Sequence, residues 1–344
     1  MKKFKRSKAI GFFDEDFRLS RLTALGDPLI KLANGIDFEV FRTFLESNLS
    51  KLAKGKGGRP PYDYVLMFKI LILQRYYNLS DNQTEFQIND RMSFMRFLKL
   101  TIADDIPDSK TIWHFKEQLV DLELVGKLFQ LFIVELEKLG LIINEGKIVD
   151  ASFIEVPIQR NNRDENKEIK EGTTPKSFTD APNKLSQKDI DARWTTKNNA
   201  HIYGYKNHTK VDSGSKIITH FIVTDASVHD SQALGDLLTH KDEGEPLYAD
   251  SAYTGCEQEK TIEANKMINN VCEKGARSHP LTENQIEKNR QKSKTRARGE
   301  HPYAFMEMSM NGMYLLAVGK KRIAALVGLM NLTYNMFRKI QLSA

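Results

Sequence analysis

Two aspartates in strand-like segments could take part in metal-dependent chemistry. Asp150 lies within the run 147–154, and Asp250 ends the short apolar run 246–249, just before small and turn-forming residues. A carboxylate in or at the end of a buried strand is costly unless a positive group meets it. A divalent cation is one such group.

A third acid, Glu300, lies in a basic segment. Lys288, Lys292, Arg296 and Glu300 recur every four residues, so in a helix they share one stripe. Such a stripe can follow a phosphate backbone while Glu300 reaches bound ions. A solvated charged helix is the alternative for this run taken alone.

The three acids fit phosphodiester chemistry by the two-metal mechanism. That mechanism needs carboxylates that hold two ions about 3.5–4 Å apart. Mg²⁺ prefers oxygen ligands and keeps several waters, so two or three acidic side chains are enough. We therefore predict that Asp150, Asp250 and Glu300 are catalytic and bind two Mg²⁺ or Mn²⁺ ions.

The charge of the chain permits a polyanionic partner. Lys and Arg number 51 against 45 Asp and Glu, a net charge of +6. The distribution is more informative than the total, because the basic residues cluster. The clusters are Lys2, Lys3, Lys5, Arg6 and Lys8, then Lys54, Lys56 and Arg59, then the segment 288–298.

Size and composition indicate an ordinary globular protein. The 344 residues allow two domains, since single cores stop growing at roughly 250–300 residues. The apolar run 10–13 is too short for a secretory signal, and no apolar stretch of about 18 residues occurs. Two cysteines and eight scattered histidines give no zinc pattern. We expect an intracellular protein with no membrane partner.

Residues 62–142 are predicted to be helical. Ser80 and Gln83 form a capping-box pattern at one helix start. The segment 106–111, which includes Lys110, indicates a loop and another helix start. That helix could be the recognition helix of a helix-turn-helix, and a capped bundle helix is the alternative. A long amphipathic helix is predicted over 119–139.

After Gly146 the pattern changes to strands alternating with helices. The segment 159–191 is polar and poor in apolar residues, so we expect a flexible excursion. The expected organisation is a basic arm (1–36), a helical domain (37–143) and an α/β domain (144–344). Strands are predicted at 147–154, 203–211, 217–224, 246–250 and 268–272, and helices at 231–238, 258–265, from 281 onward and at 323–337.

Several segments resemble a known family in the family's own order. Asp150 in "IVDAS", Asp250 in "YADSAYTG" and Glu300 in "RARGEHPYAFM" resemble the Asp-Asp-Glu triad of bacterial insertion-sequence transposases, in the IS-five branch of the IS-four superfamily. Further matches are "GRPPYDYVLMFKILIL", "IPDSKTIWHFKEQL", "RWTTKNNAHIYGYKNH", "VTDASVHDSQAL" and "RIAALVGLMNLTYN". The likeness covers about residues 37–342.

The resemblance implies an α/β fold with a ribonuclease-H-like mixed sheet, flanking helices and an all-α N-terminal domain. It implies Asp150 on the first strand, Asp250 on the fourth and Glu300 on a later helix. It also implies binding to the double-stranded terminal inverted repeats and to target DNA, as a homodimer, in the bacterial cytoplasm and at the nucleoid when bound.

The chain departs from the superfamily at two positions. Where a Tyr and a Lys flank the acid, this sequence has Ser293 and Glu307, while Arg296 is retained. Trp194, Lys206 and His208 match a family segment, although an ordinary half-exposed strand is an even alternative. The predicted DNA-contacting residues are Arg296, Arg298, Lys292, Lys288, Lys206, His208, Trp194 and Lys110.

The sequence therefore predicts a transposase that binds its element's terminal repeats, cleaves the DNA ends and transfers the strands. One alternative is a domesticated or inactive relative that only binds DNA. Another is a ribonuclease-H-like nuclease without strand transfer. His229, before Asp230, matches a family position, but a helix-capping role is at least as plausible.

Overall fold

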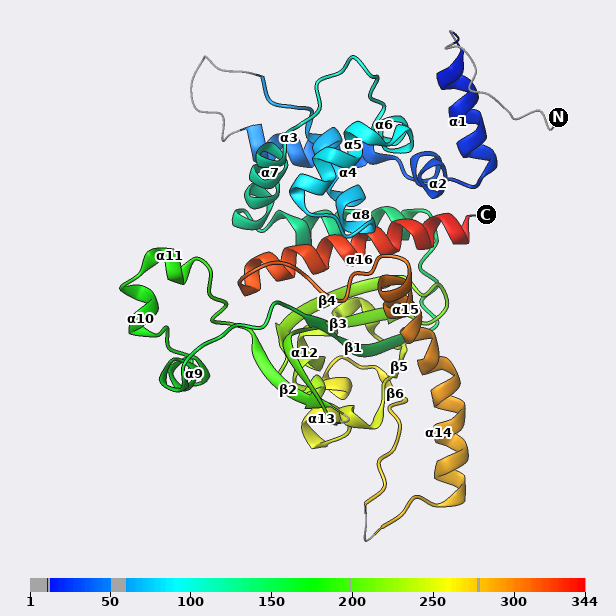
Figure 1. Ribbon diagram of the computed structural model, residues 1–344. Helices are drawn as coiled ribbons and strands as arrows, with labels where there is room; N and C mark the ends of the chain where they lie inside the picture. Colours follow the sequence, from blue (N-terminus) through cyan, green and yellow to red (C-terminus); the bar gives the residue numbers. More distant parts are fainter. Residues whose placement is uncertain (1–10, 12, 51–59, 198, 277–278, 344) are drawn as a thin grey trace, which may run out of the picture.

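The computed structural model describes residues 11, 13–50, 60–197, 199–276 and 279–343 (Figure 1). Two basic clusters of the sequence, at residues 2–8 and 54–59, lie outside the described residues. The third cluster, at residues 288–298, is described in full.

The N-terminal part is helical. Its central helix is α4, in which every residue from Met67 to Arg75 is buried, as its all-round apolar sequence predicts. The capping box of Ser80 and Gln83 is formed at the start of α5 and confirms that expectation. The elements are α1 (Asp14–Ala24), α2 (Pro28–Gly35), η1 (Phe38–Phe41), α3 (Arg42–Leu49), α4 (Tyr64–Tyr76), α5 (Asp81–Asp90), α6 (Met92–Leu98), α7 (Ser109–Asp121) and α8 (Leu124–Lys138).

Two features of this region differ from the sequence prediction. The expected basic arm contains α1 and α2, and α2 buries Leu29 and Leu32 in the core. The single helix expected over 119–139 is two helices, because Glu123 adopts a left-handed conformation with φ of 51°. A left-handed residue cannot continue a right-handed helix, so α8 starts in a new direction.

The C-terminal part is built on a six-stranded mixed sheet. β1 pairs antiparallel with β3 and parallel with β5, β5 pairs parallel with β6, and β4 pairs antiparallel with β3. β2 pairs antiparallel with β3. When β2 is left out, the strand order β4-β3-β1-β5-β6 is the ribonuclease-H-like order that the sequence predicts. The strands are β1 (Lys147–Glu155), β2 (Arg193–Lys197), β3 (Ala200–Asp212), β4 (Ile218–Asp225), β5 (Pro246–Tyr248) and β6 (Ile268–Asn269).

Short helices connect the later strands, and three longer ones follow the sheet. The hairpin turn between β3 and β4 is held by Asp212, whose carboxylate accepts hydrogen bonds from the backbone N–H and hydroxyl of Ser215. These elements are η3 (Asp230–Ala233), α12 (Leu234–Leu237), η4 (His240–Asp242), η5 (Ser251–Tyr253), α13 (Cys256–Ala264), α14 (Glu283–Arg296), η6 (Ala297–Gly299), α15 (Glu300–Met308) and α16 (Lys320–Leu342).

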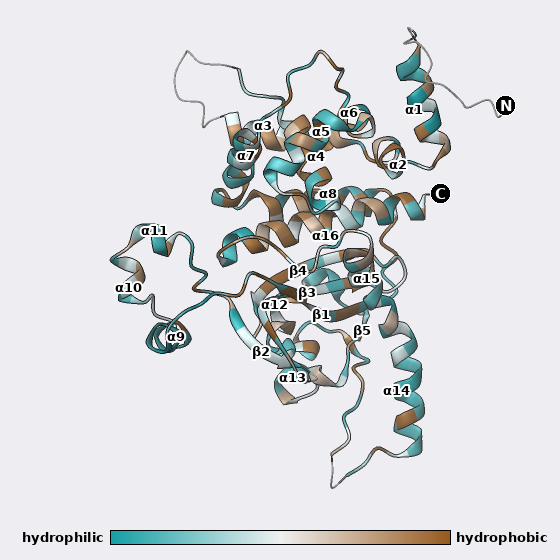
Figure 2. Cartoon of the chain, viewed as in Figure 1, coloured by the Kyte–Doolittle hydropathy of each residue, from teal (hydrophilic) through white to brown (hydrophobic). Residues whose placement is uncertain are grey.

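Helix α16 joins the two parts of the molecule. It lies between the N-terminal helices and the sheet (Figure 1), and one hydrophobic cluster runs through both. Asn331 exchanges hydrogen bonds with Asn207 of β3, while Arg322 forms a bidentate ion pair with Glu117 of α7. Figure 2 shows apolar residues gathered on α4 and α16 and a mostly hydrophilic α14. The helical part is therefore packed directly on the mixed sheet.

The polar insertion after β1 is folded, which corrects the expectation of a flexible excursion. It forms α9 (Arg163–Lys170), α10 (Lys176–Thr179) and α11 (Pro182–Leu185), which stand apart from the sheet in Figure 1. Phe178 is fully buried, and Glu165 accepts hydrogen bonds from Lys184 and Ser177. One aromatic side chain and one carboxylate organise these few residues into a small core.

Candidate active site

Asp150 and Asp250 follow matching positions of two adjacent parallel strands. The last pair of the β1–β5 ladder is Ile148 with Tyr248. Asp150 lies two residues further along β1, and Asp250 lies two residues after Tyr248, just beyond the end of β5. Side chains alternate along a strand, so Asp150 shares the face of Ile148, and Asp250 continues the face of Tyr248. The parallel pairing thus brings together two acids that are 100 residues apart in the sequence.

Glu300 reaches the same face from the far end of the chain. Gly299, one residue earlier, packs so tightly on β1 that a Cβ there would lie 2.6 Å from Cγ2 of Ile148. Because η6 lies so close to β1, the guanidinium of Arg296 lies between the carboxylates of Asp150 and Glu300. It is 3.9 Å from Asp150 Oδ2 and 3.2 Å from Glu300 Oε1.

Tyr303 anchors the helix that begins with Glu300. Its buried hydroxyl lies 2.9 Å from the backbone oxygen of Asp150 and 2.8 Å from the hydroxyl of Thr209. Since Thr209 pairs with Asp150 across the β1–β3 ladder, this tyrosine fixes α15 to the strand beside the aspartate. The Glu300 side chain is 59% exposed and pairs with Arg296.

The environment of Asp150 resists its negative charge. Burial raises the pKa of the Asp150 carboxyl to about 6, against the opposing effects of the Ala151 N–H and Arg296. The nearby charges of Asp250 and Glu300 raise this pKa further. A carboxyl that is buried beside two further acids is a group that a positive ion would stabilise in its charged form.

The donor set fits a hard divalent cation, but the three carboxylates are not gathered at ligand distance. Among the described residues, no group of three His, Cys, Asp or Glu side chains is close enough to hold one metal ion. Glu300 is instead paired with Arg296. The two aspartates supply the oxygen ligands that Mg²⁺ prefers, and Glu300 would have to leave Arg296 to complete the set.

Several predicted DNA-contacting residues lie on or beside α14. Lys288 is exposed, whereas the ammonium of Lys292 donates to the Val271 carbonyl at 2.9 Å. Arg296 and Glu300, which are four residues apart, form an ion pair, although the 3-10 helix η6 separates α14 from α15. Arg298 is exposed and donates to the Ser213 carbonyl. Of these cations, Arg296 is the one that the structure places beside Asp150.

Two of the expected DNA contacts are buried within the sheet. Lys206 is 8% exposed, and its ammonium donates to the Val228 carbonyl and to Asp230. His208 is fully buried, and burial lowers its pKa to about 4. Neither side chain can reach a DNA backbone from these positions, so Lys206 and His208 are not part of the proposed DNA surface.

Trp194 and Lys110 are accessible. Trp194, on β2, is 51% exposed and packs against Tyr203. Lys110 is exposed in the first turn of α7, near Trp113, which is 47% exposed. The same helix is also a packed bundle helix, because Lys116 pairs with Asp81 of α5. Both interpretations of α7 therefore remain compatible with its position.

Sequence reasoning did not single out Tyr253, a buried tyrosine near the aspartates. Tyr253 ends η5, the short helix that Asp250 caps by accepting from the Ala252 N–H. In the sequence, Tyr253 could have been found from its position three residues after Asp250. His229 has the helix-capping role that was the alternative to a family role. Its ring accepts a hydrogen bond from the Ser231 N–H at the start of η3 and also contacts the Ser231 hydroxyl.

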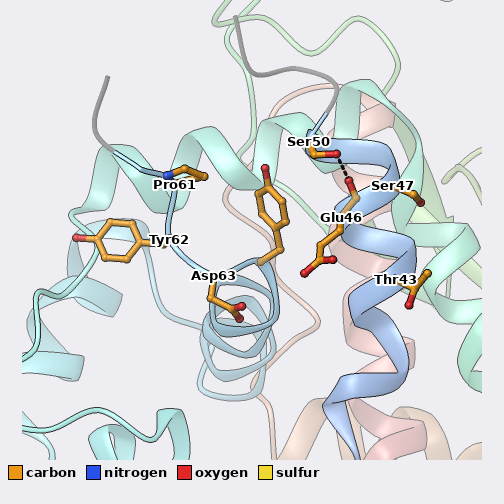
Figure 3. Close-up of a pocket in the computed structure, with 8 residues that line it drawn as sticks. Thr43, Glu46, Ser47, Ser50, Pro61, Tyr62 and Asp63 are labelled. Atoms are coloured by element: carbon orange, nitrogen blue, oxygen red, sulfur yellow. Dashed lines mark hydrogen bonds between the residues drawn. The ribbon is translucent and has the colours of Figure 1, made fainter. Parts of the chain in front are cut away.

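A hollow of about 650 Å³ lies in the helical part and is separate from the three acids. Figure 3 shows the carboxylates of Glu46 and Asp63 at its wall, with the hydrogen bond from the Ser50 hydroxyl to the Glu46 carbonyl. Arg42 pairs with both acids. One guanidinium leaves these two carboxylates with a net negative charge, which disfavours phosphate binding, so this hollow does not fit a DNA phosphate. Its lining residues are Thr43, Glu46, Ser47, Ser50, Pro61, Tyr62, Asp63 and Tyr64.

A ribonuclease-H-like sheet with aspartates beside its first and fourth core strands, and a glutamate on a later helix, defines a DDE transposase. Residues 144–336, more than half of the sequence, match the family described as Transposase DDE domain. The chain belongs to this family. Residues 17–118 match a second family, Transposase domain (DUF772). These matches confirm the DDE transposase prediction and are compatible with the IS-five branch.

One solved structure to which the chain is similar is the cryo-EM structure of the piggyBac transposase synaptic complex with hairpin DNA. The two chains are 14% identical, with a TM-score of 0.46, and the match covers 88% of this chain and 74% of the other. In the described part of the chain, no helix is both long and apolar enough to cross a membrane.

Proposed function

We propose that this transposase binds the terminal inverted repeats of its own insertion sequence, cleaves the DNA ends and joins the freed ends to target DNA. The observation that carries the proposal is the position of Asp150 and Asp250 on one face, beyond the last paired residues of adjacent parallel strands. Glu300, linked to Asp150 through Arg296, supplies the third acid.

The roles of the residues follow from their surroundings. Divalent cations of this class of enzyme activate the attacking oxygen and stabilise the leaving oxygen. Asp150 and Asp250 would offer carboxylate ligands from the sheet, and Glu300, which is paired with Arg296, would complete the set by turning toward the ions. Arg296, once released, can pair with a DNA phosphate, because guanidinium groups bind phosphate strongly.

The DNA is proposed to lie along α14 and its neighbours. Lys288 and Arg298 are exposed and basic, and Trp194 on β2 and Lys110 on α7 are further exposed candidates for DNA contact. Backbone contacts of this kind give affinity that falls as salt rises. Two element ends must be handled together, so the active form is proposed to be a homodimer, acting in the bacterial cytoplasm and at the nucleoid.

The test is cleavage of labelled element-end DNA by the purified full-length chain with Mg²⁺ or Mn²⁺. Asp250→Asn should abolish cleavage while DNA binding is retained, and Asp104→Asn, an exposed aspartate of the helical part, is the control. Equal cleavage by Asp250→Asn and the unchanged chain would overturn the metal assignment. Tight end binding without cleavage by the unchanged chain would favour the DNA-binding relative. Cleavage without joining to a plasmid would favour a nuclease.

A further inference from the structure

Arg296 is a built-in positive group among the acids of the candidate active site. Its guanidinium lies 3.9 Å from Asp150 Oδ2 and 3.2 Å from Glu300 Oε1, so it contacts two of the three carboxylates. In the part of the chain that the structure describes, no other Lys or Arg forms an ion pair with Asp150, Asp250 or Glu300. Arg296 is therefore the internal counterion of this site.

The neighbouring cations of the same segment are held elsewhere. Lys292 and Arg298 each donate to a backbone carbonyl of another segment. The Arg290 side chain is 74% exposed, and its ion pair lies within α14. The contact with the acids is therefore specific to Arg296, and a change at Arg290 removes the same charge from α14 without touching them.

The guanidinium and a divalent cation compete for the same carboxylates. With Arg296 in place, a cation gains less attraction from Asp150 and Glu300 and is repelled by Arg296 itself. The side chains of Arg296 and Asp150 are only 25% and 22% exposed, so salt and water screen these charges less than at an open surface. The chain without DNA therefore has a cation site that its own arginine opposes.

A DNA phosphate can remove this opposition. Guanidinium groups bind phosphate oxygens through two parallel N–H donors, and a phosphate is the reacting group under the proposed function. When Arg296 turns to a phosphate, Asp150 and Glu300 lose their counterion, and partly buried carboxylates without a counterion are costly. A divalent cation then meets carboxylates that are free to bind it. Because coupling between two sites is reciprocal, a bound cation also favours binding of the phosphate.

We propose that Arg296 is a positioning residue that couples DNA to the divalent cation: it keeps the cation affinity of the chain low until a DNA phosphate draws it away from Asp150 and Glu300. This inference rests on the proposed function. Coupling between two sites typically changes an affinity about 5–150-fold. The transposase thus completes its metal site on DNA and not in free solution.

The first experiment measures the Mn²⁺ affinity of the full-length chain without DNA. Arg296→Gln should bind Mn²⁺ about tenfold more tightly than the unchanged chain, because the competing charge is gone. Arg296→Lys keeps the charge and should stay near the unchanged chain. Arg290→Gln is the matched control and should also stay near the unchanged chain. A residue that only supports the fold would lower the affinity or leave it unchanged when replaced.

The second experiment adds element-end DNA with a phosphorothioate at the cleavage position, which keeps the negative charge and slows cutting. This DNA should raise the Mn²⁺ affinity of the unchanged chain about tenfold, after subtraction of the Mn²⁺ that DNA alone binds. The affinity of Arg296→Gln should rise much less. Equal rises in the two chains would overturn the coupling.

Asp250→Asn separates failure of this inference from failure of the proposed function. If the unchanged chain and Asp250→Asn bind Mn²⁺ equally, or neither binds it with DNA present, the cation site and the role of Arg296 are both overturned. If Asp250→Asn loses binding but Arg296→Gln binds no more tightly than the unchanged chain, only the role of Arg296 is overturned.

Discussion

Gly299 lies against Ile148 so closely that a β-carbon would come within 2.6 Å of the isoleucine Cγ2. Gly299 has an ordinary helical φ of −69°, so its lack of a side chain serves this contact and not an unusual backbone conformation. The contact sets the distance between the strand of Asp150 and the helix of Glu300.

Gly299→Ala should therefore move η6 away from β1 and slow end cleavage, with a stability loss of about 1–3 kcal/mol from overpacking. Gly126→Ala is the control, because a Cβ in that position of α8 meets nothing within 4 Å. The control should be neutral or stabilising, since alanine favours helix. Thermal unfolding and end cleavage measure both variants, and full activity of Gly299→Ala would contradict the role of the contact.

The raised pKa of Asp150 predicts a pH-dependent stability. The carboxyl has a pKa of about 6 in the folded chain and about 3.9 when unfolded. Between these values the folded state binds more protons, so its stability falls as the pH rises from about 4 to about 6. The loss is on the order of 3 kcal/mol, and it persists above pH 6.

Asp150→Asn removes this effect. In the absence of divalent cations the variant should melt at a higher temperature than the unchanged chain at pH 7.5, and the difference should vanish near pH 4. Asp104→Asn should show the opposite sign, because hydrogen bonds from Thr101 lower the pKa of that exposed carboxyl. Thermal unfolding across this pH range is the measurement. A less stable Asp150→Asn at pH 7.5 would show that its charge is already compensated.

The sequence predicted those parts of the fold that local patterns determine. The strands β3 and β4 followed from the strand patterns at 203–211 and 217–224, and the cap of α5 followed from Ser80 and Gln83. β2 was missed, because its sequence from Arg193 to Lys197 is mostly polar and half-exposed. The sequence predicts a flexible insertion, because the small core of this segment depends on very few side chains, Phe178 foremost.

The candidate site shows the same division. Asp150 and Asp250 could be predicted from the sequence because each is a single aspartate in or after a strand-like run. Their position side by side follows only from the parallel ladder of β1 and β5. The burial of Lys206 was not predictable, because its partner Asp230 is 24 residues away. Nor could a pattern show that the hydroxyl of Tyr253 has no hydrogen-bond partner among the described residues, since that depends on packing between η3 and η5.

Two cations on α14 and its end should separate DNA affinity from catalysis. Lys288 is exposed and remote from the acids along the helix, whereas Arg296 contacts Asp150 and Glu300. If both contact phosphates, Lys288→Gln and Arg296→Gln should each reduce the slope of log affinity against log salt by about 0.9. Only Arg296→Gln should also slow cleavage at saturating DNA.

Filter binding at several salt concentrations gives the slopes, and single-turnover cleavage gives the rates. An unchanged slope for Lys288→Gln would remove α14 from the DNA surface. Equal cleavage rates for the two variants would show that Arg296 serves affinity alone.

Phe178 should hold the insertion together independently of the sheet. Its ring is fully buried, and the ammonium groups of Lys184 and Lys188 lie 4.7 and 5.5 Å from its centre. Phe→Ala in a core costs about 3–5 kcal/mol, which is more than so small a helical unit can lose and remain folded. Phe178→Ala should therefore open the insertion while Asp189, which accepts from the buried Tyr205 hydroxyl, keeps its base attached to β3.

Limited proteolysis is the direct measurement for this variant. Cleavage should appear between residues 159 and 191 in Phe178→Ala, while the main unfolding transition stays in place. Phe86→Ala, at a position that is 64% exposed on α5, should leave the insertion resistant. If Phe178→Ala lowers the main transition as well, the insertion is part of the same cooperative unit as the sheet, and its order is coupled to that of the three acids.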